Sequence, residues 1–221
     1  ELLKQINEYK ITDAVKSVTN PETRTYGSED HKYKVALFDF GYKRNIRNEL
    51  VNRGCEVIVV PADTTAEQIK EIAPDGIMFS NGPGDPSENT EVIKNIREIA
   101  QLGIPIFGIC LGHQLMALAH GATTQKLKYG HRGANQPVID KALGKTFVTS
   151  QNHGYAVVGE SMDPEIGEVS HINANDGTCE GMRYKNINAF TVQFHPEAHG
   201  GPQDTAYLFD EFIEMIKKEM H

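Results

Sequence analysis

From residue 34 onward, short apolar runs alternate with segments whose apolar residues recur at helical spacing. The runs 35–40, 56–60, 76–80 and 104–107 are typical of buried strands, and the segments between them predict helices over about 44–53, 66–72 and 91–102. Thr64 and Glu67 have capping-box spacing at the start of the second helix. Because parallel neighbours need crossover helices, this order predicts an α/β fold with a doubly wound, mostly parallel sheet of the flavodoxin-like kind.

The pattern becomes strand-rich in the C-terminal half. Short strand candidates lie at 136–140, 145–150, 155–158, 168–172, 179–184 and 189–194, and a closing helix is predicted over about 204–219. Asn175-Asp176-Gly177 is typical of a hairpin turn. We therefore expect extra antiparallel strands after the parallel part of the sheet.

Residues 1–33 lack a clear core pattern. Leu2, Leu3 and Ile6 favour a short helix, and the stretch 20–31 is typical of a loop. The chain opens with Glu1 rather than Met, which indicates a fragment or a processed product. We expect 1–33 to be a linker or the remnant of a missing N-terminal domain, and 34–221 to form one domain.

Composition narrows the class of protein. The chain has 221 residues, 39% of them hydrophobic and 24% charged, as in ordinary globular proteins. A net charge of −8 argues against nucleic-acid binding, and neither a membrane-span-like run nor a signal peptide is apparent. The three cysteines are widely spaced, with no metal-binding pattern among them. We therefore expect free thiols, no metal and a cytoplasmic location.

Gly108, Cys110 and Gly112 lie where the apolar run 104–107 gives way to a helical pattern over 115–120. A strand that turns sharply into a helix, with a cysteine at the corner, is the arrangement of a nucleophile elbow. Small residues two positions to each side are needed because a Cβ there would strike the opposing backbone. The helix N-terminus favours negative charge on the sulfur. We interpret Cys110 as a catalytic nucleophile; the alternative is a buried, inert thiol.

A cysteine nucleophile needs a base, and the base needs an orienting partner. Among the nine histidines, His195 is singled out because it directly follows the apolar run 189–194. Sites in parallel sheets gather at the carboxyl ends of strands, where Cys110 also lies. Glu197 is close enough in sequence to fix the imidazole tautomer. We predict a Cys110, His195 and Glu197 triad; the alternative for His195 is a strand-end histidine satisfied by water.

Acyl transfer also requires hydrogen-bond donors for the oxyanion. The backbone N–H of Leu111, directly after the nucleophile, is the first candidate. The glycine-rich loop 80–86 can supply the second, although taken alone it is better explained as a plain turn. Cys55 and Cys179 have no such context, and we interpret both as structural.

Three segments, SNGPGDP at 80–86, GICLGHQ at 108–114 and QFHPE at 193–197, together resemble the class I (triad) glutamine amidotransferase family. The resemblance covers residue 34 to the C-terminus and implies that glutamine is the substrate, hydrolysed through a cysteinyl thioester. By motif position, Gly82 and Leu111 would supply oxyanion or substrate N–H groups. It further implies a glutamine site lined by Gly84, Gln114, Asn152, Gly154 and Tyr155. In this family His113 is not the base, so we expect it to serve packing or partner contact.

The stretches 39–46, 150–155 and 197–204 resemble in particular the glutaminase subunits of carbamoyl-phosphate synthetases. This implies that the partner is a large synthetase subunit, to which ammonia passes for pyrimidine and arginine synthesis. The chain has no recognisable ATP-binding motif. We therefore expect no cofactor in this chain, with ATP, Mg and bicarbonate used by the large subunit.

In such subunits an N-terminal domain adds a serine to the glutamine site, so a chain without it is expected to bind glutamine more weakly. Other hypotheses remain open from the residues alone. One is an amidotransferase of another biosynthetic complex, and a second is a thiol hydrolase or peptidase on the same fold. A third is a regulatory or docking domain that has lost activity.

Overall fold

The computed structural model describes residues 2, 3, 5, 11–199 and 204–220. These form a sheet in the order β1-β3-β2-β4-β5-β10-β9-β8-β6-β7. The strands are β1 (Arg24–Tyr26), β2 (Tyr33–Asp39), β3 (Cys55–Pro61), β4 (Gly76–Phe79), β5 (Ile106–Ile109), β6 (Thr123–Asp140), β7 (Lys145–Val158), β8 (Gly167–Asn173), β9 (Cys179–Tyr184) and β10 (Ala189–Val192). Strands β3, β2, β4, β5 and β10 run parallel, and β9, β8, β6 and β7 pair antiparallel. The predicted fold class is confirmed.

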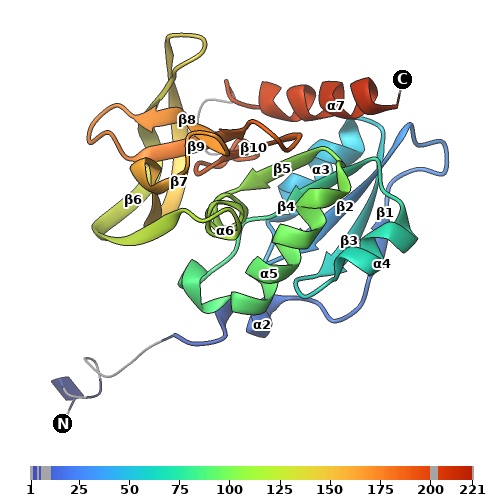
Figure 1. Cartoon of the computed structure of the whole chain (residues 1–221), viewed down its shortest axis with the longest axis horizontal. Helices are drawn as coiled ribbons and strands as arrows, with labels where there is room; N and C mark the ends of the chain where they lie inside the picture. The colour runs from blue at the N-terminus through green and yellow to red at the C-terminus, as the bar shows by residue number, and fades with distance from the viewer. Residues whose placement is uncertain (1, 4, 6–10, 200–203, 221) are drawn as a thin grey trace.

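Helices cover both faces of the parallel strands (Figure 1). They are α2 (Ala14–Val18), α3 (Arg44–Asn52), α4 (Ala66–Ile72), α5 (Thr90–Ile99), α6 (Leu111–Ala119) and α7 (Tyr207–Glu219), with short 3₁₀ turns at Pro86–Glu88, Ala100–Leu102 and Gly159–Ser161. Side chains of α4, α5 and α6 share one apolar core, and those of α3 and α7 share the other. Alternate residues of β2 enter opposite cores, Ala36 and Phe38 the first, Val35 and Leu37 the second. Burial on both faces explains the continuous apolar runs in the sequence.

Most predicted elements are present, with shifted ends. The fourth parallel strand begins at Ile106, not residue 104, because Pro105 has no N–H to donate. The capping box of α4 is formed by Thr65 and Gln68, not Thr64 and Glu67. The Thr64 hydroxyl instead donates to the Pro61 carbonyl at 2.8 Å.

The largest correction concerns β6 and β7. The sequence predicts a strand only at 136–140 and two separate strands at 145–150 and 155–158, but the structure has two long strands paired along their length. Register shifts near residues 126–131 and 133–136 absorb the glycines that break the sequence pattern. The stretch 150–155, which lies largely between two predicted strands, is therefore held as strand beside the elbow helix.

Part of the stretch expected to be a linker is ordered. Strand β1 pairs antiparallel with β3 at the sheet edge, and Ala14 and Val15 of α2 are buried. Of the short helix expected around Leu2, Leu3 and Ile6, Ile6 lies outside the described residues. The proposed division at residue 34 remains a prediction.

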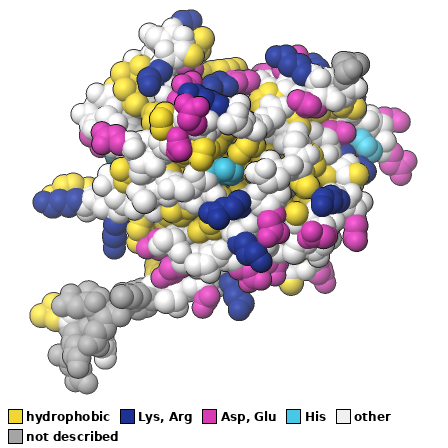
Figure 2. All heavy atoms as spheres, viewed as in Figure 1, with side chains coloured by type: hydrophobic (Ala, Val, Ile, Leu, Met, Phe, Trp, Pro, Cys, Tyr) yellow, Lys and Arg dark blue, Asp and Glu magenta, His cyan; other side chains and the backbone are white. Residues whose placement is uncertain are grey.

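Charged side chains of both signs are interspersed on the face shown in Figure 2. Within the described parts of the chain, none of the helices has the length and apolar character needed to cross a membrane.

Candidate active site

Cys110 occupies the corner between β5 and α6. It is the N-cap of α6 and has φ 53° and ψ −101°, a conformation that is strained for a residue with a Cβ. Two backbone hydrogen bonds hold this corner: Cys110 N–H donates to Val192 O at 2.8 Å, and Gly112 N–H donates to Ser80 O at 3.0 Å. The sequence-predicted elbow is therefore present, fixed against the ends of β10 and β4.

The flanking glycines are required by packing. A Cβ on Gly112 would lie 2.3 Å from Phe79 O, and one on Gly108 would lie 2.8 Å from the Thr191 side chain. Contacts this short with backbone leave no room for a side chain. The elbow can therefore form only with glycine on the α6 side.

We expect Gly112→Ala to lower the free energy of unfolding by about 3 kcal/mol, because the new methyl group collides with a strand carbonyl. Gly103→Ala is the control. Gly103 has a left-handed φ of 75° but open space around a Cβ, so only the backbone cost of about 1 kcal/mol is expected. Denaturant unfolding of both variants measures the difference. Equal losses would show that the Phe79 contact is not limiting.

His195 and Glu197 form a buried pair beside the elbow. His195 Nδ1 lies 2.7 Å from Glu197 Oε1, and the two residues are 4% and 2% exposed. Because a carboxylate only accepts, Nδ1 carries the proton, and Nε2 is left for the sulfur of Cys110, whose side chain hydrogen-bonds to His195. The structure thus brings the three predicted triad residues together.

The charge of His195 is set by competing effects. Burial disfavours the imidazolium, but the negative charges of Glu197 and Cys110 outweigh it and raise the pKa of His195 to about 9. At neutral pH the ring is therefore protonated and paired with the sulfur.

Two residues that the sequence analysis did not single out contact Glu197. The side-chain amide of Asn45, in the first turn of α3, donates to the Glu197 carbonyl oxygen. The Lys43 ammonium lies 3.8 Å from Glu197 Oε1. They belong to the stretch 39–46, whose resemblance to relatives was the only signal available for them.

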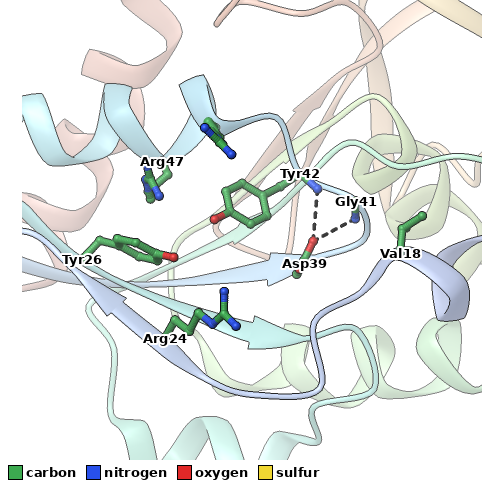
Figure 3. A pocket seen from close by; sticks show the side chains of 8 residues that line it. Val18, Arg24, Tyr26, Asp39, Gly41, Tyr42 and Arg47 are labelled. Atoms are coloured by element: carbon green, nitrogen blue, oxygen red, sulfur yellow. Dashed lines mark hydrogen bonds between the residues drawn. The ribbon is translucent and has the colours of Figure 1, made fainter.

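Asp39 shapes the turn that presents these residues. Its carboxylate accepts from the N–H groups of Gly41 and Tyr42 at 3.0 and 3.1 Å, as Figure 3 shows. A cavity of about 420 Å³ opens beside the turn, and its lining includes Arg24 and Arg47. The Asp39 carboxylate at the end of β2 thus holds the loop that carries the two residues in contact with Glu197.

The two predicted oxyanion donors lie next to each other. A Cβ on Gly82 would lie 2.6 Å from the Leu111 side chain and 2.3 Å from Phe40 O. As the first residue of α6, Leu111 has an N–H with no intrahelical acceptor. Gly84, with φ 92°, packs against Ala14, whose Cβ a side chain would meet at 2.7 Å. The glycines of this loop are thus demanded by protein packing, in addition to any ligand.

Three of the residues predicted to line the glutamine site share one cavity. Gly84, Gly154 and Tyr155 line a space of about 530 Å³ together with Asp85, Glu88, Lys126 and Arg132. Hydrogen bonds from Ser87, and a further one from Tyr155, lower the pKa of the Asp85 carboxyl against its burial. The cavity is therefore lined by both acidic and basic side chains.

The other two predicted lining residues are placed differently. Gln114 is 3% exposed, and its amide nitrogen donates to Tyr155 O and to Gln193 Oε1, both at 2.8 Å. It therefore braces the strand that carries Tyr155. Asn152 is exposed and lies opposite Arg132 in the β6–β7 register. The substrate roles of both remain predictions.

The remaining candidates have structural roles. His113 is fully buried and bonds to the Thr191 hydroxyl at 2.8 Å. Burial lowers the pKa of His113 to about 3, so it is neutral packing, as expected. Burial also raises the pKa of both Cys55 and Cys179 to about 12, which keeps these thiols protonated.

Comparisons with known proteins agree with this geometry. Residues 36–215 match the family model described as glutamine amidotransferase class-I. The chain is 51% identical over 216 residues to the carbamoyl phosphate synthase small chain of Bacillus cereus, covering 98% of this chain and 58% of the relative. It is 54% identical over 220 residues to that of Staphylococcus epidermidis, covering 98% and 59%.

A solved structure, described as that of a putative GMP synthase protein from Thermoplasma acidophilum, superposes with a TM-score of 0.76 at 22% identity. The match covers 86% of this chain and 96% of that one. At this identity the likeness concerns the fold alone. The chain spans just under three fifths of the length of the curated relatives it matches.

Proposed function

Because the chain belongs to the glutamine amidotransferase class-I family, we propose that it hydrolyses the side-chain amide of glutamine and delivers ammonia to a synthetase partner. The observation that carries the proposal is the buried His195–Glu197 pair in contact with a cysteine at a strained strand–helix corner. This arrangement matches the needs of acyl transfer by a thiolate.

In the first step the Cys110 thiolate attacks the amide carbon of glutamine. The Leu111 and Gly82 N–H groups would receive the oxyanion. As the C–N bond breaks, His195 gives its proton to the departing nitrogen, which leaves as ammonia. A glutamyl thioester remains on the sulfur.

In the second step His195, now neutral, takes a proton from water as the water oxygen attacks the thioester carbon. The C–S bond breaks, glutamate is released, and the sulfur and imidazolium return to their starting charges. Glu197 keeps the ring in one tautomer and stabilises its positive charge throughout.

The cavity lined by Gly84, Gly154 and Tyr155 supports a small amino acid as the acyl donor. Its volume of about 530 Å³ and its lining of Asp85, Lys126 and Arg132 suit a molecule that carries an ammonium and a carboxylate. A peptide offers neither group at an internal residue. Gly84, Gly154 and Tyr155 form the wall against which the glutamine side chain would extend.

The relatives named carbamoyl phosphate synthase small chain support the choice of partner. We infer that the large synthetase subunit receives the ammonia and uses ATP, Mg and bicarbonate to make carbamoyl phosphate, in the cytoplasm. Bulk water would protonate ammonia, so transfer through a protected path is expected. This chain needs no cofactor for its own step.

We expect the chain to release ammonia and glutamate from glutamine, and not from peptides with glutamine at an internal position, because the cavity recognises the free amino-acid ends. Ammonia release with and without a large carbamoyl phosphate synthase chain measures this. Stimulation by that chain supports the partner assignment. Peptide hydrolysis in the absence of glutamine hydrolysis would instead favour a thiol peptidase.

A further inference from the structure

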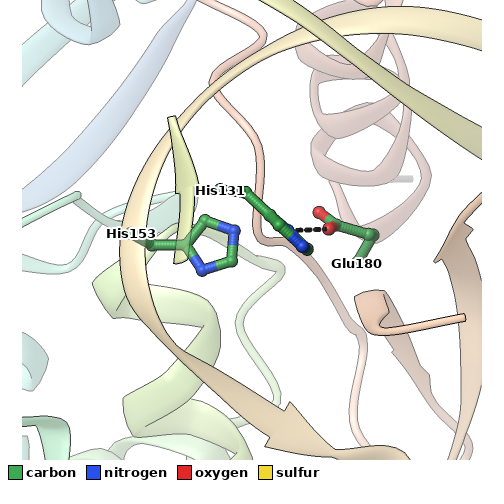
Figure 4. A group of neighbouring side chains, drawn as sticks. All are labelled: His131, His153 and Glu180. Carbon is green, nitrogen blue, oxygen red and sulfur yellow. Dashed lines mark hydrogen bonds and ion pairs between the residues drawn. The ribbon is translucent and has the colours of Figure 1, made fainter. Parts of the chain in front are cut away.

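Two histidines, a glutamine and a glutamate converge in the antiparallel part of the sheet. His131 of β6 and His153 of β7 are opposite each other in register. Gln151 lies two residues before His153, and Glu180 comes from β9. One nitrogen of each histidine and one oxygen of Glu180 lie within 4.8 Å of one another (Figure 4).

The outer nitrogen of each histidine is committed to a fixed acceptor. His153 Nδ1 lies 2.7 Å from the Tyr155 carbonyl oxygen and therefore donates to it. His131 Nε2 lies 2.9 Å from the Asp176 carboxylate and donates likewise. A backbone carbonyl or a carboxylate behind the ring is the usual arrangement of metal-binding histidines, since it fixes the tautomer and turns the other nitrogen to the ion.

The inner nitrogens meet oxygen atoms. Gln151 Oε1 lies 2.9 Å from His153 Nε2 and 3.1 Å from His131 Nδ1. The glutamine amide is oriented by its nitrogen, which donates to the Thr149 hydroxyl at 3.1 Å. With its proton on Nδ1, a neutral His153 therefore points a lone pair at another lone pair. Only a cation or an extra proton between them makes this contact favourable.

Glu180 adds a charged oxygen to the same point. Its side chain is fully buried, and its Oε1 lies 3.1 Å from His131 Nδ1. Asn173 donates to Oε1 at 3.3 Å, but Oε2 has no hydrogen-bond partner among the described residues. A buried carboxylate oxygen without a donor is costly unless a positive charge compensates it.

The geometry points to a divalent metal site formed by His131, His153, Glu180 and Gln151, of the nitrogen–oxygen type that Zn²⁺ occupies. Tetrahedral Zn²⁺ with bonds of about 2.0–2.1 Å holds its ligand atoms about 3.3 Å apart. The contacts of Gln151 Oε1 with the two histidines and of His131 with Glu180, at 2.9 and 3.1 Å, are near this value. The ligand atoms of His131, His153 and Glu180 lie within 4.8 Å of one another, so these side chains would draw closer together around the ion.

A bound ion would join β6, β7 and β9 behind the wall of the substrate cavity. His153 bonds to the carbonyl of Tyr155, a lining residue, so the ion would fix the strand that presents it. The competing explanation is a doubly protonated His131 between Asp176 and Glu180, which needs no metal. It leaves the His153 contact with Gln151 unexplained.

The test is Zn²⁺ titration calorimetry, with Co²⁺ absorption as a second readout, on the chain carrying Cys110→Ser so that the triad thiolate cannot bind the ion. We expect one equivalent of Zn²⁺ and a four-coordinate Co²⁺ spectrum. Saturating Zn²⁺ should raise the melting temperature by about 5 °C, as expected for a ligand at about 100 times its Kd.

Matched variants locate the site. In the same background, His153→Asn should abolish the Co²⁺ spectrum, and Asp176→Asn should weaken binding by about 10–100-fold. Glu180→Gln keeps the side-chain shape and should weaken binding at least about tenfold. His120→Asn changes a histidine at the C-cap of α6 that bonds to a backbone carbonyl, and it should leave Zn²⁺ binding unchanged. Absence of stoichiometric binding by the folded chain, or binding unaffected by Glu180→Gln, would overturn the proposal.

Discussion

Cys110→Ser is expected to lower glutamine hydrolysis by at least about 10³-fold without unfolding the chain. A serine hydroxyl fits the same corner, but a hydroxyl is a much weaker acid than a thiol and therefore a poorer nucleophile beside His195. Glutamate release at saturating glutamine, measured with and without the synthetase partner, gives the ratio. Thermal unfolding reports whether the elbow is intact.

The other two thiols are the controls for this prediction. Cys55→Ala and Cys179→Ala should retain turnover, since burial keeps both thiols protonated. A glutamine-like alkylating agent should likewise modify only Cys110, as peptide mapping can show even if the isolated chain turns over slowly. Modification of Cys55 or Cys179, or an unchanged rate for Cys110→Ser, would contradict the assigned nucleophile.

The elbow and the triad could be predicted because their signals are local. A strand-to-helix boundary with glycine two positions to each side of Cys110 is visible in a few residues, and the contacts of Gly112 show why no other residue fits. His195 could be selected from nine histidines because the carboxyl ends of parallel strands meet at one edge of the sheet. Both inferences use only short stretches and one rule of topology.

The strand pairing that builds β6 and β7 left no comparable signal. The stretch 123–135 is polar and glycine-containing, and it is strand because β7 pairs with it through two register shifts. The opposition of His131 and His153, and the approach of Glu180 from β9, follow from that pairing. No spacing within the sequence predicts such a cluster. The expectation of no metal was based on the spacing of the cysteines, which are not part of it.

Apart from the resemblance of the stretch 39–46 to relatives, nothing in the sequence indicated the residues that contact Glu197 from another element. Asn45 and Lys43 reach Glu197 because the turn after β2 is held by Asp39. Their side chains are ordinary for a helix start and show no catalytic pattern. Only the folded arrangement indicates that they act on the triad glutamate.

The pH dependence of catalysis tests whether Glu197 sets the charge of His195. In the first step His195 must be protonated, so activity should fall as the pH rises through its pKa of about 9. The negative charge of Glu197 raises that pKa, whereas burial lowers it. Without the Glu197 charge, the effect of burial is less opposed, and the pKa of His195 falls. The alkaline limb must therefore move to lower pH.

For Glu197→Gln we accordingly expect kcat/KM at neutral pH to fall by about 10²-fold, from the lost charge and the lost orientation of the ring. The alkaline limb of the pH profile should shift down by at least about one unit. Glu49→Gln, which removes a carboxylate paired with Arg53 on α3, should leave the limb in place. Because a merely structural role for Glu197 would reduce the rate without moving the limb, a lower rate with an unshifted profile would refute the electrostatic role.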